Sequence, residues 1–321
     1  MLMMLISTQA FQTFVPSLIP PQPCHHSRHH SHQRHHSLVL SATTAVTPIG
    51  PFCPFRSQAS EQLNKPMKQV AFAAPQYETS LARLQLDLQM GNTPSKETLL
   101  QTSDMLDTAV EQWENLNQNM LQSTDFQSRE YAHMTQAHLL TYTDSVEDLA
   151  ASMKWQAACL RAMANNESPP LPPPGVNFNK LLQAAQDDKS PSIGTMMATA
   201  ERLTAKPFRG DEAIFESSPL VKHEFEQLCR DHQHLVDFGG NYGNFDPLGK
   251  LYFLDEIAKI HERWDVFFAR ASLMEMIDSN YTRQVHDFLE AMDLNETTYR
   301  QQLDEAHQIM RRAAEKERNM I

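Results

Sequence analysis

The sequence predicts an all-α protein with two helical-bundle modules that follow a disordered presequence. After residue 75 there is little alternation of apolar and polar residues, and apolar residues recur at intervals of three and four. The run from Ser168 to Gly175 contains five prolines, so it cannot be helical. We therefore expect modules at residues 76–165 and 217–318, joined by a Pro-rich linker with short helices at residues 166–215.

Charge is distributed unevenly along the 321 residues. The first 60 contain no Asp or Glu, and their only basic residues are Arg28, Arg34 and Arg56. The remaining chain holds 24 basic and 39 acidic residues, a balance that repels the phosphate backbone of nucleic acids. No apolar run approaches the roughly 20 residues of a membrane span, although peripheral membrane association stays open.

Residues 1–60 have the composition of a plastid-targeting presequence. They are rich in Ser and Pro, and prolines such as Pro16 and Pro20 interrupt the amphipathic helix that is typical of a mitochondrial presequence. Ala10 and Phe11 resemble the junction of a bipartite signal and transit peptide. Seven histidines between residues 25 and 36 are interpreted as low-complexity transit sequence. We expect cleavage between about residues 55 and 75.

The first module is expected to contain three amphipathic helices. The first runs over about residues 76–90 and stops at Gly91, and Thr93-Pro94 supplies the cap and first residue of the next. The third pattern follows Ser123-Thr124 and continues without a break to about Ala164. The second helix is expected to bury Leu99, Leu106, Val110, Trp113, Leu116 and Met120.

The second module is expected to contain four helices. They begin at Ser217-Ser218-Pro219, at Asp246-Pro247, near Tyr281 and after Asn295. The first should end at Gly239-Gly240, with one glycine in the left-handed conformation. Side chains predicted to face the core are Leu220, Phe225, Leu228, Leu235, Val236, Leu251, Leu254, Ile257, Ile260, Trp264, Phe267, Tyr299, Leu303, Ala306, Met310 and Ala313.

Residues 239–250 read Gly-Gly-Asn-Tyr-Gly-Asn-Phe-Asp-Pro-Leu-Gly-Lys. They resemble the Gly-Ser-x-Tyr-Gly-Lys-Phe-Asp-x-x-Gly-Lys pattern of a small helical family of unknown function from cyanobacteria and plastid-bearing eukaryotes. Residues 263–270 resemble a second pattern of that family, and the resemblance covers about residues 217–316. Asn244 and Ala269 replace lysines of the family, and Gly240 replaces a serine. The resemblance implies photosynthetic organisms and no particular reaction.

This hairpin is the best candidate site, although much of it can be explained as helix capping. Asp246 can accept the first amide hydrogens of the next helix. Capping does not account for Gly249 or Tyr242, and close approach by a partner or a neighbouring helix would account for both. The candidate interaction surface is Tyr242, Phe245, Asp246, Gly249, Lys250, Arg263 and Arg270, where the two arginines share one helix face beside aromatic residues.

No catalytic constellation is evident, and no cofactor or metal is expected. Glu130 and His133 form one Glu-x-x-His pair, whereas a di-iron bundle needs two. His232 and His234 diverge on a helix and are expected to face solvent. Cys159 and Cys229 are interpreted as free thiols on helices.

Three functional hypotheses follow. The first is a non-enzymatic plastid protein, in the stroma or at the thylakoid periphery, that holds or assembles photosynthetic components through helical surfaces. The second is a small-molecule or metal-binding bundle, or an enzyme, with a polar pocket near Glu130, His133 and His138. The third is a coiled-coil-like adaptor that dimerises through its long helices.

Overall fold

The computed structural model describes residues 79–181, 207–208 and 218–320, apart from Gln85, Leu88, Gln89 and Tyr142. Their regular structure is helical and these ranges contain no strand, so the predicted all-α fold is confirmed. An isolated bridge links Phe208 to Ile277. The predicted presequence and residues 182–206 of the predicted linker lie outside the described residues.

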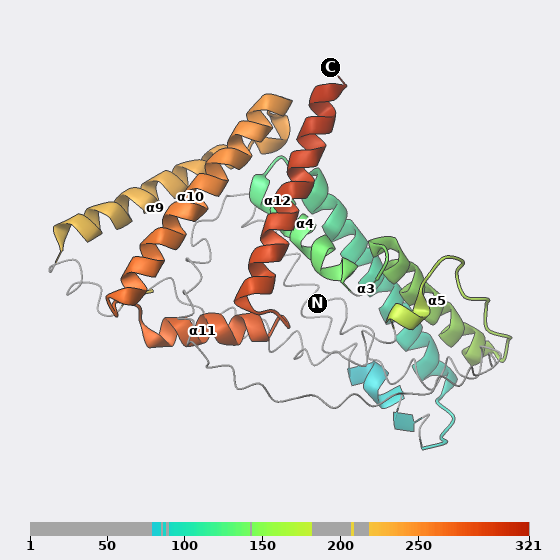
Figure 1. Ribbon diagram of the computed structural model, residues 1–321. Helices are drawn as coiled ribbons and strands as arrows, with labels where there is room; N and C mark the ends of the chain where they lie inside the picture. The colour runs from blue at the N-terminus through green and yellow to red at the C-terminus, as the bar shows by residue number, and fades with distance from the viewer. Residues whose placement is uncertain are drawn as a thin grey trace, which may run out of the picture.

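The described chain forms helices that associate in pairs (Figure 1). The α-helices are α3 (Lys96–Gln122), α4 (Phe126–Leu140), α5 (Val146–Asn165), α9 (Pro219–Gly239), α10 (Pro247–Leu273), α11 (Ser279–Glu290) and α12 (Glu296–Asn319). A short 3₁₀ turn, η2 (Tyr242–Asn244), lies between α9 and α10. None of these helices is long and apolar enough to cross a membrane.

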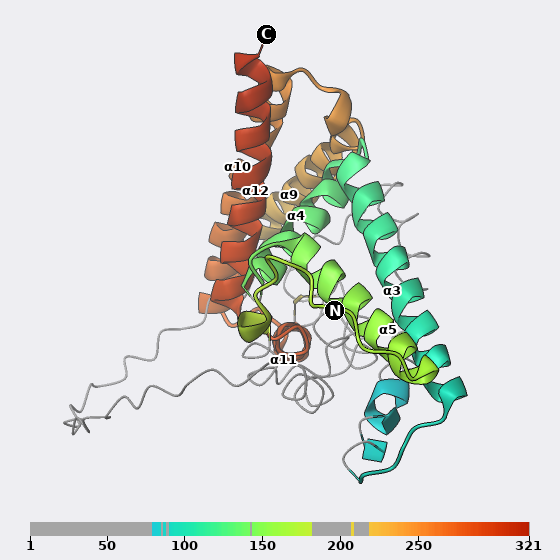
Figure 2. The ribbon, with the colours of Figure 1, turned by 90° about the vertical axis from the view of Figure 1, so that its right-hand side faces the viewer.

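Helices α3 and α5 lie side by side along most of their length (Figure 2). The apolar stripe predicted for α3 is buried, as are Leu149, Met153 and Leu160 of α5. At the centre of the pair, the hydroxyl of Ser103 donates to the carbonyl of Ala157 at 2.9 Å. An ion pair between Glu114 and Lys154 joins the outer surfaces of the two helices.

The predicted uninterrupted helix from residue 126 to residue 164 is wrong. Helix α4 ends at Leu140, and α5 begins after Ser145, whose hydroxyl accepts from the amide of Asp148 at 3.1 Å. The helical spacing of apolar residues continues across this turn, so the periodicity of the sequence does not indicate the end of α4. The start of α3 also differs: Ser95, not Thr93, is the cap and accepts from the amide of Thr98.

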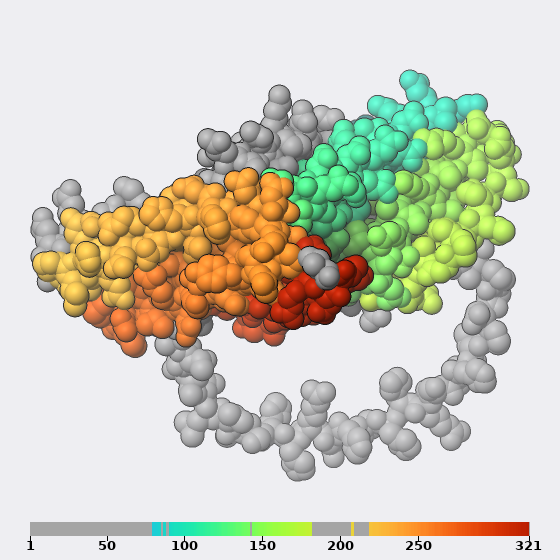
Figure 3. Space-filling view, turned by 90° about the horizontal axis from the view of Figure 1, so that it is seen from above, coloured from blue at the N-terminus to red at the C-terminus, as the bar shows by residue number. Residues whose placement is uncertain are grey.

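Helix α4 lies against α12 and α9 as well as against α3. Seen from above, α12 lies between the α9–α10 pair and the N-terminal helices (Figure 3). The division into two modules stays a prediction, but α4 connects the regions where the modules were expected. Its buried residues are few and include Phe126, Ala132 and Leu139.

A second core lies among α9, α10 and α11. It contains Phe208, Leu228, Ile260, Trp264, Phe267, Phe268, Ala271, Ile277, Tyr281, Val285 and Leu289. Two residues predicted to face inward do not. Leu220 is in the first turn of α9 and is exposed, and Ala313 is exposed whereas Ala314 is buried. A residue in the first turn of a helix can lie beyond the end of the neighbouring helix, and sequence spacing does not show this.

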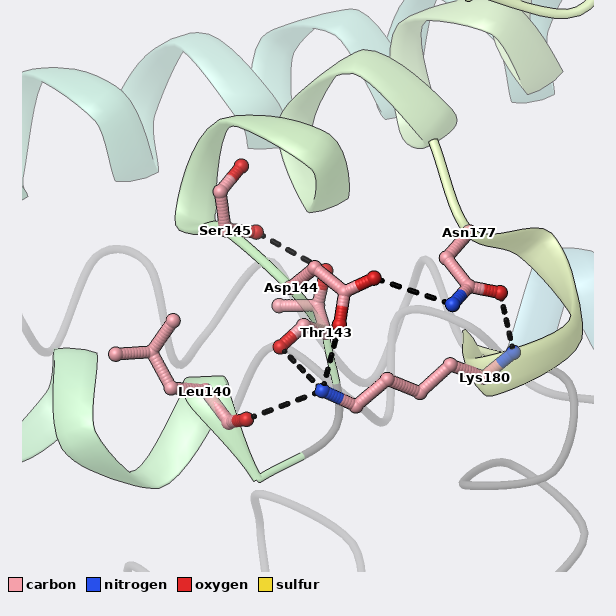
Figure 4. Close-up of polar contacts among 6 residues, drawn as sticks. All are labelled: Leu140, Thr143, Asp144, Ser145, Asn177 and Lys180. Atoms are coloured by element: carbon pink, nitrogen blue, oxygen red, sulfur yellow. Dashed lines mark hydrogen bonds and ion pairs between the residues drawn. The ribbon is translucent and has the colours of Figure 1, made fainter. Parts of the chain in front are cut away.

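The Pro-rich segment folds back onto the α3–α5 pair. The indole N–H of Trp155 donates to the carbonyl of Pro170 at 3.0 Å, and its ring packs on Phe178 at 5.1 Å between centroids. Lys180 then crosses the turn between α4 and α5 (Figure 4). Its ammonium group donates to the carbonyl of Thr143 and to Asp144, both at 2.9 Å. These bonds attach the segment that follows the prolines to the turn between α4 and α5.

We predict that Lys180→Met lowers the free energy of unfolding by about 1–2 kcal/mol, because the carbonyl of the buried Thr143 loses its charged donor. Urea denaturation measures this effect. The matched control is Lys154→Met, which removes an exposed pair with Glu114 and should change stability by less than about 1 kcal/mol. Equal effects of the two substitutions would contradict the role given to Lys180.

Candidate functional site

The loop between α9 and α10, here called the glycine hairpin (residues 239–249), is built from two closely spaced helix ends. Helix α9 ends at Gly239, and the C-cap residue Gly240 has φ −55°, in the right-handed region, so the predicted left-handed glycine is wrong. A left-handed residue is not needed at Gly240, because the backbone continues from α9 into the 3₁₀ turn η2. In this turn the amide of Phe245 donates to the carbonyl of Tyr242 at 3.1 Å. Left-handed glycines in the described ranges occur at Gly91 and Gly175.

Asp246 caps α10 as the sequence predicts. Its carboxylate accepts from the amide of Gly249 at 2.7 Å, and Pro247 takes the first helical position. A Cβ on residue 249 would lie 2.7 Å from that carboxylate and 3.3 Å from the Cβ of Phe245. A glycine at position 249 therefore leaves room for the capping carboxylate of Asp246. The close packing within the hairpin explains why glycine occupies this position.

The turn between α3 and α4 packs directly against the glycine hairpin. The amide of Gly243 donates to the carbonyl of Thr124 at 2.7 Å. A Cβ on residue 243 would lie 2.9 Å from the Cα of Thr124, so any larger residue would push the two backbones apart. A Cβ on Gly239 would meet the ring of Phe253 at 2.8 Å and the Cβ of Phe126 at 3.2 Å. Two glycines thus permit a contact with a segment more than a hundred residues away.

Tyr242 lies in the core and not on a surface. It is 2% exposed and packs with Phe126, whose ring centroid is 5.4 Å away, and with Phe253 at 5.5 Å. The rings of Phe126 and Phe253 are 4.8 Å apart in an edge-to-face arrangement. Burial raises the pKa of Tyr242 to about 12, so its phenol stays neutral. This aromatic cluster fixes α4 on the glycine hairpin.

The other predicted site residues divide into two groups. At the hairpin, Phe245 is half-buried with its ring 4.6 Å from that of Phe238, and Lys250 is buried and pairs with Glu317 at 2.5 Å. This pair joins the start of α10 to the end of α12, which lie together at the top of Figure 1.

The two arginines lie farther along α10 and face α9. Arg263 pairs with Asp231 at 2.8 Å, and Arg270 approaches Glu224 at 3.4 Å. Both side chains are exposed, so each pair contributes little to stability. The two ion pairs link α9 to α10 and place charged side chains on the exposed surface of both helices.

A row of titratable side chains crosses the centre of the molecule, here called the histidine row: Glu130, His307, His261 and His232. They come from α4, α12, α10 and α9 respectively. The imidazole of His307 donates to Glu130 at 2.6 Å, and its ring stacks on His261 at 5.8 Å between centroids. The ring centroid of His261 lies 6.1 Å from that of His232.

The far end of the row shows that His232 does not face solvent as predicted. It is 3% exposed, and its Nδ1 accepts from the indole N–H of Trp264 at 3.1 Å. Burial lowers the pKa of His232 to about 4, with His261 adding to the effect. Burial also lowers the pKa of His261. Both imidazoles are therefore neutral near pH 7.

Glu130, His133 and His138 do not share one pocket in the structure. Glu130 accepts from His307, His133 contacts Gln136 within α4 at 3.1 Å, and His138 contacts Gln302 of α12 at 3.0 Å. Among the described residues, no group of three His, Cys, Asp or Glu side chains could hold a metal ion. Burial raises the pKa of the Cys159 and Cys229 thiols to about 11, which leaves both protonated.

These features define the class of the protein. It is an all-helical protein in which the glycine hairpin packs against the turn between α3 and α4, which is remote from it in the sequence. Residues 212–314 match the DUF1825 family model, a domain of unknown function. The matched range contains α9, α10, α11 and the hairpin, and α12 as far as residue 314, and it leaves α3, α4 and α5 outside. The resemblance expected at residues 217–316 is thus confirmed as a domain of unknown function. Searches of the curated proteins and of the solved structures found no match.

We predict that Gly243→Ala lowers the free energy of unfolding by about 1–3 kcal/mol, because its Cβ would meet the Thr124 backbone. Thermal or urea denaturation measures the change. Gly240→Ala is the matched control, since that glycine is right-handed and its Cβ would meet only the carbonyl of Asp237, at 3.3 Å. The control should shift stability by less than about 1 kcal/mol. A Gly243→Ala protein as stable as the control would contradict the contact.

Proposed function

We propose that this protein is a non-enzymatic interaction or assembly protein of the plastid, associated with the photosynthetic apparatus and acting through the outer face of α9 and α10. The observation that carries the proposal is a set of exposed apolar side chains at one end of this pair. Phe238, Leu248 and Tyr252 each expose more than half of their surface. Leu248 and Tyr252 are four residues apart and lie on the same face of α10.

A groove of about 410 Å³ continues this face along the two helices. It is lined by Asp231, His234, Leu235, Phe238, Glu256, Lys259, Ile260 and Arg263. The charged side chains pair across or beside it, Arg263 with Asp231 and Lys259 with Glu256 at 2.7 Å. Aromatic residues next to arginine and surrounded by charged groups are the composition of a protein-protein interface.

The plastid setting rests on other observations. The first 60 residues lack acidic side chains and are rich in Ser and Pro, as transit peptides are. The resemblance of the hairpin to a family of photosynthetic organisms supports an association with photosynthetic complexes. It is support by association, since a shared fold does not define an activity.

The test is affinity purification of the tagged mature protein from mildly solubilised plastids, followed by mass spectrometry. We expect one defined photosynthetic or assembly complex to be recovered with the wild-type protein. Leu248→Ser combined with Tyr252→Ser should lower its recovery at least tenfold, because both side chains are exposed and their loss leaves the core intact. The matched control is Leu220→Ser, an exposed leucine at the opposite end of α9.

Recovery of the protein without a stoichiometric partner would contradict the proposal. It would favour the alternative, a small-molecule or metal-binding helical bundle, and direct screening to metabolites and metal ions. Recovery of the same complex with both variants would place the interaction away from this face of α10.

A further inference from the structure

The Pro-rich segment, residues 168–175, has an extended backbone. Proline fixes its own φ at about −65° and keeps the residue before it out of the helical region. Five of the eight residues are prolines, and Ser168 and Leu171 each precede one. Residues 168–173 form neither helix nor strand, and Gly175, at φ 90°, ends the extended run. Successive residues restricted in this way adopt the polyproline II helix, which has three residues per turn.

One edge of this extended segment is fixed to the α3–α5 pair. At three residues per turn, residues 170, 173 and 176 lie along the same edge. The carbonyl of Pro170 accepts from the indole N–H of Trp155 at 3.0 Å. Pro173 is half-buried, and Val176 packs against the apolar core that α3 and α5 share. The helices therefore hold one side of the segment and leave the other sides free.

The free side of the segment is apolar. Leu171 exposes 90% of its surface, more than any other large apolar side chain of the described residues. Pro172 and Pro174 are exposed as well, and residues 168–179 contain no charged side chain. A single exposed leucine is ordinary, whereas a continuous uncharged strip of proline rings around a leucine indicates a binding surface.

We propose that residues 169–174 are a preformed polyproline II ligand that docks in the aromatic-lined groove of a separate protein domain. Such grooves take proline rings and aliphatic side chains between aromatic rings. They also supply donors to the backbone carbonyls, since prolines have no N–H groups to bond them. This surface lies on the N-terminal helices and is independent of the surface proposed on α9 and α10.

The contact with Trp155 shows the same recognition chemistry within the molecule. An indole N–H donates to a proline carbonyl, and the ring of Phe178 packs beside the indole at 5.1 Å between centroids. This contact engages the backbone at Pro170. The side chains of Leu171 and Pro172 stay available to a second aromatic surface.

The segment is anchored on both sides before any partner binds. Trp155 holds Pro170, and after the prolines the side-chain amide of Asn177 donates to Asp144 at 3.1 Å. A flexible ligand loses backbone freedom when it binds, and this loss lowers its affinity. An anchored segment has already lost much of that freedom, which distinguishes it from a flexible linker.

The charge around the segment indicates what surrounds the partner's groove. Residues 79–181 contain 6 Lys or Arg and 12 Asp or Glu, a formal charge of −6, and Glu167 lies directly before Ser168. Complementary charge orients two proteins as they meet and raises the rate of association. The fitting partner therefore has an aromatic groove with Lys and Arg around it.

The test titrates the full chain into isolated SH3, WW and EVH1 domains, three kinds of domain whose aromatic grooves bind proline-rich peptides. Each domain is labelled with ¹⁵N, and its chemical-shift changes are followed by NMR. We expect at least one domain to bind with a dissociation constant in the micromolar range. Leu171→Ser and Pro172→Ala should each weaken this binding at least about fivefold, because both side chains are exposed and contribute to the contact. Leu220→Ser, which changes an exposed leucine of α9, is the matched control and should leave the affinity unchanged.

A further variant, Trp155→Phe, tests the anchoring, since it removes the indole donor to Pro170. Binding should weaken about threefold, because the segment then loses more freedom when it docks.

Three results would overturn the proposal. The first is that none of the three domains binds. The second is an unchanged affinity of Leu171→Ser, which would place the contact on another surface. The third is tighter binding by Trp155→Phe, which would show that Trp155 conceals the segment from partners.

Discussion

The backbone contact between Gly243 and Thr124 is the constraint on which the rest of the structure depends. An amide–carbonyl bond of 2.7 Å joins the loop of one helix pair to the turn of another. It brings Phe126 into the aromatic cluster of Tyr242 and Phe253, and it aligns α4 with α12. The histidine row and the Lys250–Glu317 pair both form around helices positioned in this way.

Much of the fold could be predicted because it depends on local chemistry. Asp246 and Asn295 cap their helices as expected, and Pro219 and Pro247 occupy first helical positions. These features require only neighbours three residues apart. The turn at residues 141–145 was missed because the apolar spacing runs through it without a change of phase.

The site was predicted only in part, because its partner is remote in sequence. The unexplained Gly249 and Tyr242 indicated close packing at the hairpin, and the structure shows such packing for both. Nothing in residues 239–249 identifies Thr124 and Phe126 as the contact, since a three-dimensional neighbour leaves no local periodicity. The same holds for His261 and His307, which are 46 residues apart and stack only after α10 and α12 have packed.

A double-mutant cycle between Phe126 and Phe253 tests the central claim, that the hairpin holds α4, most directly. Both residues are changed to Leu, singly and together, and the free energy of unfolding of the full chain is measured in urea. The 4.8 Å edge-to-face contact predicts a coupling energy of about 0.5–1.5 kcal/mol. Additive effects, within about 0.3 kcal/mol, would show that the two rings do not touch and would contradict the account.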